Sequence, residues 1–281
     1  MPEINEVTIN RILNPTSIDL GEYVINPYMG CEFACTYCYV RSNKAATRRK
    51  IPWGSYVDIR VNAPDLLERE ILEKHPGTVL LGSTTECFQP VEKKFRLTRK
   101  MLEILNKHKV SYVILTRSPY IAEYVPLLNQ EFCKRIYFTV NPMSNTFKQL
   151  IEPKSPPLDS RNDAIHRLLD AGISVIPYYS PVIPWVTDIR NVFPPFAKAE
   201  RIEFEYLNFN LHHAQDMVRH ISLAEPALGI KFTGMVYEKA YYEQTWNTLD
   251  EEIARQAREA NKKYKIHRHP YGEFFQNTYF S

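Results

Sequence analysis

The sequence of 281 residues lacks any apolar run long enough to cross a membrane. A transmembrane helix needs roughly 18 or more consecutive apolar residues, and no stretch here approaches that length. The first ten residues, MPEINEVTIN, also lack the apolar core of a secretory signal peptide. Together these absences predict a protein that has no membrane segment and is located in the cytoplasm.

A large excess of charge of one sign is missing as well. The formal net charge is +3 and the sequence pI is about 8.5, whereas a dedicated nucleic-acid-binding domain usually carries a stronger and clustered basic excess. The chain has no repeat of fixed period and no low-complexity linker. Hydrophobic residues make up 44% of it, which is enough to bury a sizeable core.

Cysteine is scarce, but its distribution is uneven. Of the five cysteines, Cys31, Cys35 and Cys38 fall within the segment GCEFACTYCYVR, while Cys87 and Cys133 stand apart. An odd number with three members crowded together argues against a disulfide framework. In a reducing compartment such a group more often binds metal.

Apolar segments alternate with amphipathic ones from residue 22 to residue 209. Strands are expected at 22–30, 78–83, 111–116, 135–140, 173–183 and 201–209, and helices at 63–75, 97–108, 119–129, 160–172 and 249–264. Strands that are apolar throughout indicate a parallel sheet covered by helices. About six such units favour a partial (β/α)6 barrel of TIM type over a flat doubly wound sheet, although periodicity alone does not separate the two.

The alternation weakens after residue 211. We therefore expect a barrel core over residues 1–211. Residues 212–281 are expected to form a short C-terminal extension, largely helical, that packs on the barrel.

The spacing C-x3-C-x2-C allows two kinds of metal site. Structural zinc usually takes four protein ligands, and a zinc-stabilised binding module without catalysis remains an alternative. Thiolates also hold 4Fe–4S clusters, normally four of them. Three cysteines would leave one iron open to a ligand with an amine and a carboxylate. The segment follows the first expected strand, at the face where barrel active sites form, so we favour the cluster.

The segment CEFACTYC resembles the signature of the radical S-adenosylmethionine (SAM) superfamily, with Tyr37 as its aromatic residue. Longer stretches between Tyr23 and Pro184, among them STTECFQPVEKKFRLTRKMLEIL and IEPKSPPLDSRNDAIHRLLDAG, resemble the branch that includes spore photoproduct lyase. The resemblance implies that Cys31, Cys35 and Cys38 bind three irons of a 4Fe–4S cluster. It also implies that the cluster reductively cleaves SAM.

The cleavage that the resemblance implies yields a 5′-deoxyadenosyl radical, which abstracts hydrogen from an organic substrate that the sequence does not identify. It also implies a one-electron reductant of the flavodoxin or ferredoxin type. The cofactor-binding residues implied by the resemblance are Tyr37, Gly82, Ser83, Thr84, Arg117, Thr139 and Asn141.

Spore photoproduct lyase carries a hydrogen-donating cysteine after its second strand, where this sequence has Ser83. Cys87, four residues further on, is a candidate hydrogen donor, and it is equally well explained as a small buried hydrophobic residue. The same segment contains Glu86, Gln89 and Glu92, which we expect to face the substrate.

Two basic stretches, 44–54 and 92–100, interleave cations with Trp53 and Phe95. Such stretches can grip a phosphate backbone and stack a base, which keeps repair of a nucleic-acid lesion as an alternative function. Charged runs are more usually solvated surface, and a phosphorylated small molecule or an acidic peptide would suit the same charges.

Overall fold

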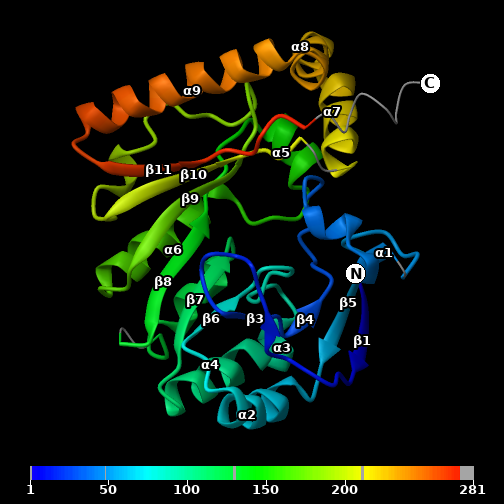
Figure 1. The fold of residues 1–281 in the computed structure, drawn as a ribbon, viewed down its shortest axis with the longest axis vertical. Coiled ribbons are helices and arrows are strands. Elements are labelled where there is room, and N and C mark those ends of the chain that lie inside the picture. The colour runs from blue at the N-terminus through cyan, green and yellow to red at the C-terminus, as the bar shows by residue number, and fades with distance from the viewer. Residues whose placement is uncertain (1, 48, 129–130, 210–211, 273–281) are drawn as a thin grey trace. The chain divides into compact units, whose positions relative to one another are not determined.

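The computed structural model describes residues 2–47, 49–128, 131–209 and 212–272 of the chain (Figure 1). The chain forms two compact units, each assembled from separate segments. The first unit comprises Met1–Ala34, Arg49–Thr139 and Ser155–Pro177, and the second comprises Cys35–Arg48, Val140–Lys154 and Tyr178–Ser281.

Strands and helices alternate through most of the chain. The strands are β1 (Glu3–Val7), β2 (Asn14–Pro15), β3 (Tyr23–Ile25), β4 (Tyr28–Met29), β5 (Tyr56–Arg60), β6 (Thr78–Leu81), β7 (Ser111–Thr116), β8 (Cys133–Thr139), β9 (Val175–Val182), β10 (Arg201–Tyr206) and β11 (Lys263–His267). The α-helices are α1 (Lys44–Thr47), α2 (Ala63–Lys74), α3 (Glu92–Phe95), α4 (Leu97–Lys107), α5 (Asn145–Ile151), α6 (Leu158–Asp170), α7 (His212–Ala224), α8 (Pro226–Tyr237) and α9 (Lys239–Glu259). Three short 3-10 helices are η1 (Tyr39–Ser42), η2 (Pro119–Tyr124) and η3 (Pro194–Phe196).

The first unit contains the parallel strands β3, β6, β7 and β8 in that spatial order, and β2 pairs antiparallel with the outer edge of β3. Leu81 of β6 is paired with Ile25 of β3 and with Ile114 of β7. All three side chains are fully buried, as expected for parallel strands covered on both faces. Their carboxyl ends meet at one edge, where the loops after β3 and β6 begin.

Two differences from the expected elements have a proline as their cause. The expected strand 22–30 is divided into β3 and β4 at Pro27, which has no N–H to donate to a sheet. The expected helix 119–129 is instead the 3-10 helix η2, because Pro126 cannot continue a helix beyond it; Asn129 lies outside the described residues.

Strand β4 belongs to a small second sheet of the first unit, in the order β1-β5-β4, which sequence periodicity did not indicate. Val57 and Ile59 of β5 pack with Tyr28 and Leu97 in one buried cluster. The small sheet thereby adjoins helix α4 and supports the chain just before the first cysteine.

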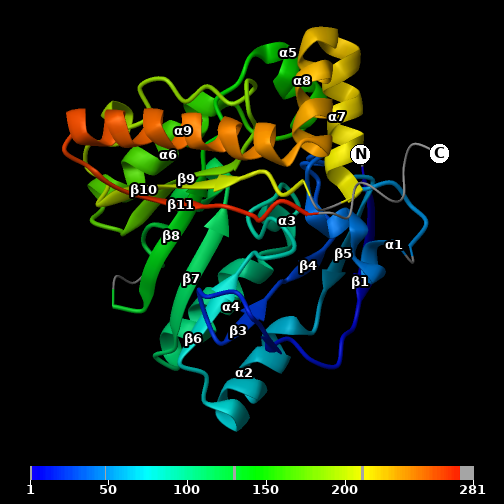
Figure 2. The same cartoon turned by 45° about the horizontal axis from the view of Figure 1, so that its top comes forward.

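The second unit contains the rest of β9 with β10 and β11, all parallel. Helix α9 runs along β10 and β11 in both views (Figures 1 and 2), and Tyr206 of β10 stacks on Trp246 of α9 with ring centroids 4.1 Å apart. The helix expected at 249–264 begins earlier, at Lys239, and ends at Glu259. Strand β11 then begins at Lys263.

Within the described residues, β2 pairs only with β3 and β11 pairs only with β10, so the strands do not close into a complete barrel. The open α/β barrel expected from the sequence is confirmed. No described helix combines the length and apolar character needed to span a bilayer. The expected boundary between residues 211 and 212 stays a prediction.

Candidate functional site

The cysteine loop, residues 30–41, begins at a glycine that the backbone requires. Gly30 has a φ of +91°, and a Cβ placed on it would lie 2.3 Å from the carbonyl oxygen of Tyr56. Only glycine tolerates both the left-handed backbone and that close approach. The N–H of Ala34 then donates to the carbonyl of Cys31 at 3.4 Å, and the N–H of Cys38 donates to the carbonyl of Cys35 at 3.3 Å. Two successive turns therefore present the three thiols on a short length of chain.

The first half of the cysteine loop is anchored to the β6 loop, residues 82–91, within the first unit. The N–H of Glu32 donates to Oε1 of Gln89 at 2.9 Å, and the N–H of Val91 donates to Oε1 of Glu32 at 2.8 Å. The carbonyl of Gly30 accepts a hydrogen bond of 2.6 Å from Thr85 Oγ1. Hydrogen bonds of this kind, buried or partly buried, hold one segment of chain in a fixed relation to the other.

The second half of the cysteine loop is anchored within the second unit to the segment that carries α5. The N–H of Thr36 donates to the carbonyl of Ile151 at 2.9 Å. The hydroxyl of Tyr37 donates to Oε1 of Glu152, and Nδ2 of Asn141 donates to the same oxygen at 3.0 Å. Tyr37 and Asn141, both implied by the resemblance to be cofactor-binding residues, are thus brought together by a third buried side chain.

The three cysteines differ in exposure, since Cys35 is buried while Cys31 and Cys38 are half-buried. None of the chain's five cysteines forms a disulfide. Within the described ranges no group of three His, Cys, Asp or Glu side chains converges closely enough to hold a single ion. In a 4Fe–4S cluster each thiolate binds a different iron, so three thiols on one short loop suit three of the irons.

Gly82, Ser83 and Thr84 follow β6 and are organised by Asn26, which follows β3. The amide of Asn26 donates from Nδ2 to Ser83 Oγ at 3.2 Å, and its Oδ1 accepts from the N–H of Thr84 at 3.0 Å. Gly82 has a φ of +86°, and a Cβ there would lie 2.5 Å from the carbonyl oxygen of Leu115. The predicted SAM-binding turn is therefore rigid and depends on Asn26, which sequence reasoning did not select.

Arg117 directly follows strand β7, and Thr139 is the last residue of strand β8. Both residues lie in the first unit. The N–H of Arg117 donates to Oε2 of Glu86 at 2.8 Å, which fixes the backbone of this residue. Thr139 is buried. Both predicted cofactor-binding residues lie at carboxyl ends of parallel strands, which is where α/β barrels form their active sites.

The prediction that Glu86, Gln89 and Glu92 face a substrate is wrong, because all three side chains are buried. Oε1 of Glu86 accepts from Thr116 Oγ1 at 2.7 Å, in addition to the bond from Arg117. Burial raises the pKa of Glu86 above its usual value, although those hydrogen bonds oppose the effect. The three residues form one internal framework, with Glu86 and Gln89 in the β6 loop and Glu92 at the start of α3.

Cys87 is fully buried in the first unit. A Cβ on Gly82 would lie 3.5 Å from its Sγ, which places the thiol under the turn after β6. Burial raises the pKa of Cys87 well above its usual value, and the charges of Glu86 and Glu92 raise it further. The group is therefore held as a thiol without solvent access, and its suggested role as hydrogen donor stays a prediction.

The end of the cysteine loop has polar partners in the second unit. Nη1 of Arg41 donates to the carbonyl of Thr36, and Nη2 pairs with Asp216 at 3.0 Å. Tyr39 is 42% exposed as a whole, but loss of water around its hydroxyl group raises its pKa above the usual value, and the neighbouring Cys38 adds to that effect. Tyr39 is consequently a neutral phenol next to a cysteine of the predicted cluster.

Several cations of the two basic stretches have local partners. Arg49 pairs with Asp58, and its guanidinium lies over the ring of Tyr56 at 5.1 Å. Arg99 pairs with Glu103 at 3.0 Å. Lys93 lies over the ring of Tyr120, 5.1 Å from its centroid. Contacts of this kind are typical of structural surface charges, and they favour that interpretation over a nucleic-acid groove.

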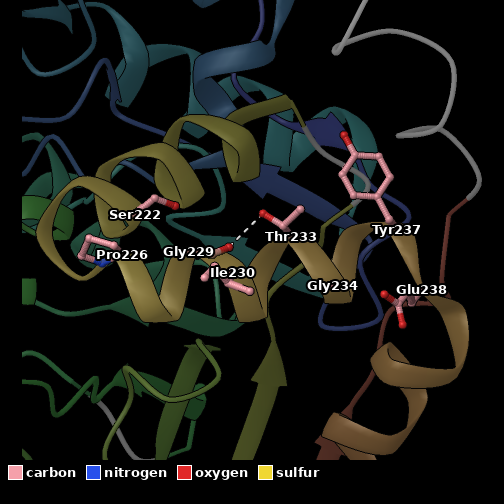
Figure 3. A pocket seen from close by; sticks show the side chains of 8 residues that line it. All are labelled: Ser222, Pro226, Gly229, Ile230, Thr233, Gly234, Tyr237 and Glu238. Atoms are coloured by element: carbon pink, nitrogen blue, oxygen red, sulfur yellow. Dashed lines mark hydrogen bonds between the residues drawn. The ribbon is translucent and has the colours of Figure 1, made fainter.

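A surface hollow of about 570 Å³ lies along α8. Its lining residues fall between Ser222 and Glu238, and none of them is a predicted site residue. Figure 3 shows its lining, in which Thr233 Oγ1 donates to the carbonyl of Gly229 at 2.9 Å. A Cβ on Gly229 would lie 2.4 Å from Ser222 Oγ, so the glycine is explained by the packing of α8 against α7. The lining includes none of the residues predicted to bind a cofactor.

Two residues important to the site were missed by sequence reasoning, Asn26 and Glu152. Asn26 stands at the end of the first strand in the segment INPY, a position typical of barrel active-site residues. Glu152, in the segment IEPKSPP, follows helix α5 and is 1% exposed. A buried acid at a helix end is a weak signal in one sequence, because most acids there are solvated.

Comparison with known proteins adds an independent finding. Residues 25–191 match the model of the Radical SAM superfamily. An uncharacterized protein of Methanocaldococcus jannaschii is 29% identical over 250 residues, which cover 88% of this chain and 93% of that protein.

Among solved structures, spore photoproduct lyase complexed with dinucleoside spore photoproduct has a TM-score of 0.55 at 16% identity, over 79% of this chain and 66% of the lyase chain. Streptococcus suis SuiB bound to precursor peptide SuiA has a TM-score of 0.52 at 12% identity, over 87% of this chain and 48% of that chain. This chain therefore spans just under two thirds of the lyase and about half of SuiB. Both likenesses concern the fold.

Proposed function

The chain belongs to the radical SAM superfamily, and we propose that it is an enzyme that reductively cleaves SAM at a 4Fe–4S cluster held by Cys31, Cys35 and Cys38. The observation that carries the proposal is the agreement between the family match over residues 25–191 and three thiols spaced C-x3-C-x2-C within that match. Two successive turns carry these thiols, and each half of the loop is anchored separately.

When bound, the cluster supplies one electron that splits SAM into methionine and a 5′-deoxyadenosyl radical, with the electron drawn from a reductant of the flavodoxin or ferredoxin type. The protein's own contribution is to bind and orient. The turn after β6, fixed by Asn26, offers the hydroxyl of Ser83 and backbone carbonyls, which suit an ammonium group. Arg117 supplies a cation for a carboxylate.

Tyr37, Thr139 and Asn141 complete the proposed cofactor site. Tyr37 and Asn141 are buried and share Glu152 as acceptor, so their positions are set before a ligand arrives. We also propose that residues 1–211 form the catalytic core and residues 212–281 an extension of it. A cytoplasmic location is part of the proposal, because the reducing conditions there would keep such thiols available.

In the proposed reaction the radical abstracts hydrogen from an organic substrate. A second candidate function is repair of a nucleic-acid lesion, which is favoured by the likeness to a lyase complexed with dinucleoside spore photoproduct. Its test is binding of duplex DNA at several salt concentrations. Affinity that falls steeply with salt supports several phosphate contacts. Weak binding that is insensitive to salt removes this candidate and leaves the general proposal intact.

The experiment that tests the proposed function is anaerobic reconstitution with iron and sulfide. A brown protein with about four irons and about four sulfides per chain is expected. Reduction with dithionite in the presence of SAM should then release 5′-deoxyadenosine. Cys35→Ala should abolish both, whereas Cys133→Ala, a control at the start of β8, should retain both. Colourless protein that binds zinc, or cleavage that survives Cys35→Ala, would overturn the proposal.

A further inference from the structure

Glu152 caps the end of helix α5 and is 1% exposed. Burying a carboxyl group is costly unless hydrogen bonds replace its lost water. Its own N–H closes the helix by donating to the carbonyl of Lys148 at 2.8 Å, which places the side chain at the start of the turn that leaves α5. Because Glu152 is buried, its carboxyl group does not serve solubility, and its hydrogen-bond partners must explain why an acid stands here.

The side chain of Glu152 collects donors from two distant parts of the second unit. Tyr37 of the cysteine loop donates its hydroxyl to Oε1, and Asn141, which follows β8, donates Nδ2 to the same atom at 3.0 Å. Tyr37 and Glu152 are separated by 115 positions in sequence. One carboxyl oxygen thus ties the cysteine loop to the segment after β8.

The orientation of the Asn141 amide follows from these bonds. Besides Glu152, Nδ2 donates to the carbonyl oxygen of Ser180 at 2.9 Å and lies 3.2 Å from the hydroxyl oxygen of Tyr37. A carboxylate and a carbonyl accept but do not donate, so the nitrogen of the amide must face them. The oxygen, Oδ1, is consequently turned to the other side.

Oδ1 of Asn141 is buried and accepts no hydrogen bond from any described residue, although Asn141 as a whole is only 4% exposed. A buried acceptor left without a donor costs about 1–3 kcal/mol, so native proteins keep one mainly where something else supplies the donor. The orphaned oxygen can therefore accept a hydrogen bond from a ligand that carries a hydroxyl or ammonium group.

We propose that Glu152 is a positioning residue, which fixes the Asn141 amide so that Oδ1 accepts a hydrogen bond from a hydroxyl or ammonium group of SAM. The inference rests on the proposed function and adds to it a residue that touches no ligand. Without the acceptor at Glu152, only the carbonyl of Ser180 still orients the amide of Asn141. The amide can then turn over more readily and present Nδ2, a donor, to the ligand's own donor.

The test measures binding of S-adenosylhomocysteine, which is not cleaved, to reconstituted protein by calorimetry. Glu152→Ala is expected to weaken binding about tenfold to a hundredfold, the equivalent of one lost buried hydrogen bond. Glu152→Gln retains an oxygen that accepts from both Tyr37 and Asn141, so it should bind within about threefold of the unsubstituted protein.

Two further variants separate positioning from general loss of structure. Glu203 of β10 is also 1% exposed and is held by Arg201 at 2.6 Å. Glu203→Ala should therefore destabilise the protein and leave the affinity unchanged. In a Tyr37→Phe background, which removes the other side chain held by Glu152, Asn141→Ala combined with Glu152→Ala should bind no more weakly than Asn141→Ala alone.

The possible results are distinct. If the unsubstituted protein forms its cluster but does not bind S-adenosylhomocysteine, SAM binding in the proposed function fails. If it binds and Glu152→Ala binds equally well, or if the effects of the Glu152 and Asn141 changes add, the positioning role is overturned. Where Glu152→Ala does not fold, Glu152→Leu fills the same volume without an acceptor and becomes the deciding variant.

Discussion

Glu32 and Gln89 each accept a hydrogen bond from the backbone of the other's segment. Gln89 Oε1 accepts from the N–H of Glu32 at 2.9 Å. Glu32 Oε1 accepts at 2.8 Å from the N–H of Val91, two residues beyond Gln89. Glu32 directly follows Cys31, and Gln89 directly precedes Pro90. Gln89 Nε2 also donates to Thr85 Oγ1 at 3.0 Å. The first cysteine is therefore positioned by a residue 58 places after it in sequence.

Gln89→Ala should loosen the cysteine loop. The change leaves the N–H of Glu32 without its acceptor, and we expect the free energy of unfolding to fall by about 1–3 kcal/mol. Iron retained after reconstitution and desalting should fall as well, and both quantities are measured on the same preparation. Gln244→Ala, at an exposed position of α9, should change neither. Full iron retention by Gln89→Ala would show that the loop does not need this contact.

Cys87 should resist alkylation in the folded protein. Its full burial and raised pKa both keep it from forming an accessible thiolate. In cluster-free protein treated with iodoacetamide at neutral pH, mass spectrometry should find Cys31 and Cys38 modified well before Cys87. In denaturant the difference should disappear. Rapid labelling of native Cys87 would mean that the thiol reaches solvent, and would contradict its burial under the turn after β6.

Glu92 should contribute more to stability than any exposed acid of the first unit. Its carboxyl group accepts from Tyr28, from Tyr124 at 2.7 Å and from the N–H of Thr98 at 3.0 Å. Glu92→Ala removes every one of these acceptors, so we expect a loss of about 3 kcal/mol or more in urea unfolding.

The matched control for Glu92 is Glu103→Ala, which removes only an exposed pair with Arg99. A change of about 0–1 kcal/mol is expected there. If Glu92→Ala and Glu103→Ala lower the free energy of unfolding by similar amounts, Glu92 does not belong to the buried hydrogen-bond framework assigned to it.

Glu70 should make stability depend on pH. Burial alone would raise its pKa, but the bonds from Lys74 at 2.6 Å and from the N–H groups of Ile12 and Leu13, each at 3.0 Å, lower it below the usual value. A carboxyl group whose pKa is lower in the folded than in the unfolded state stabilises the protein above its unfolded-state pKa. That stabilisation is lost as pH falls through the folded-state value.

Glu70→Gln should therefore destabilise the protein by about 1–3 kcal/mol at pH 7. The difference from the unsubstituted protein should shrink in acid, once Glu70 itself is protonated. Urea unfolding at pH 7 and at a series of acidic pH values provides the measurement. A difference that stays constant across the series would exclude ionisation of Glu70 as its cause.

The elements that the sequence predicted best are those governed by nearby residues. Strand β7 has the expected bounds, Ser111–Thr116, and helix α4 ends one residue earlier than expected. Continuous apolar runs and helical spacing are local signals. Of the elements predicted wrongly, η2 is affected by a proline. Strand β11 was missed because it is stabilised by pairing with β10, which is distant in the sequence.

The sequence by itself determined that three thiols fall within one short loop, and the spacing of Cys31, Cys35 and Cys38, which predicts a metal site, can be read without knowing the fold. Only the tertiary structure decided which side chains support that loop. Glu152 meets Tyr37 across 115 positions, and Asn26 meets Ser83 across 57. Hydrogen bonds between such distant positions form only after parallel strands bring their carboxyl ends to one edge, and no local pattern in the sequence encodes that meeting.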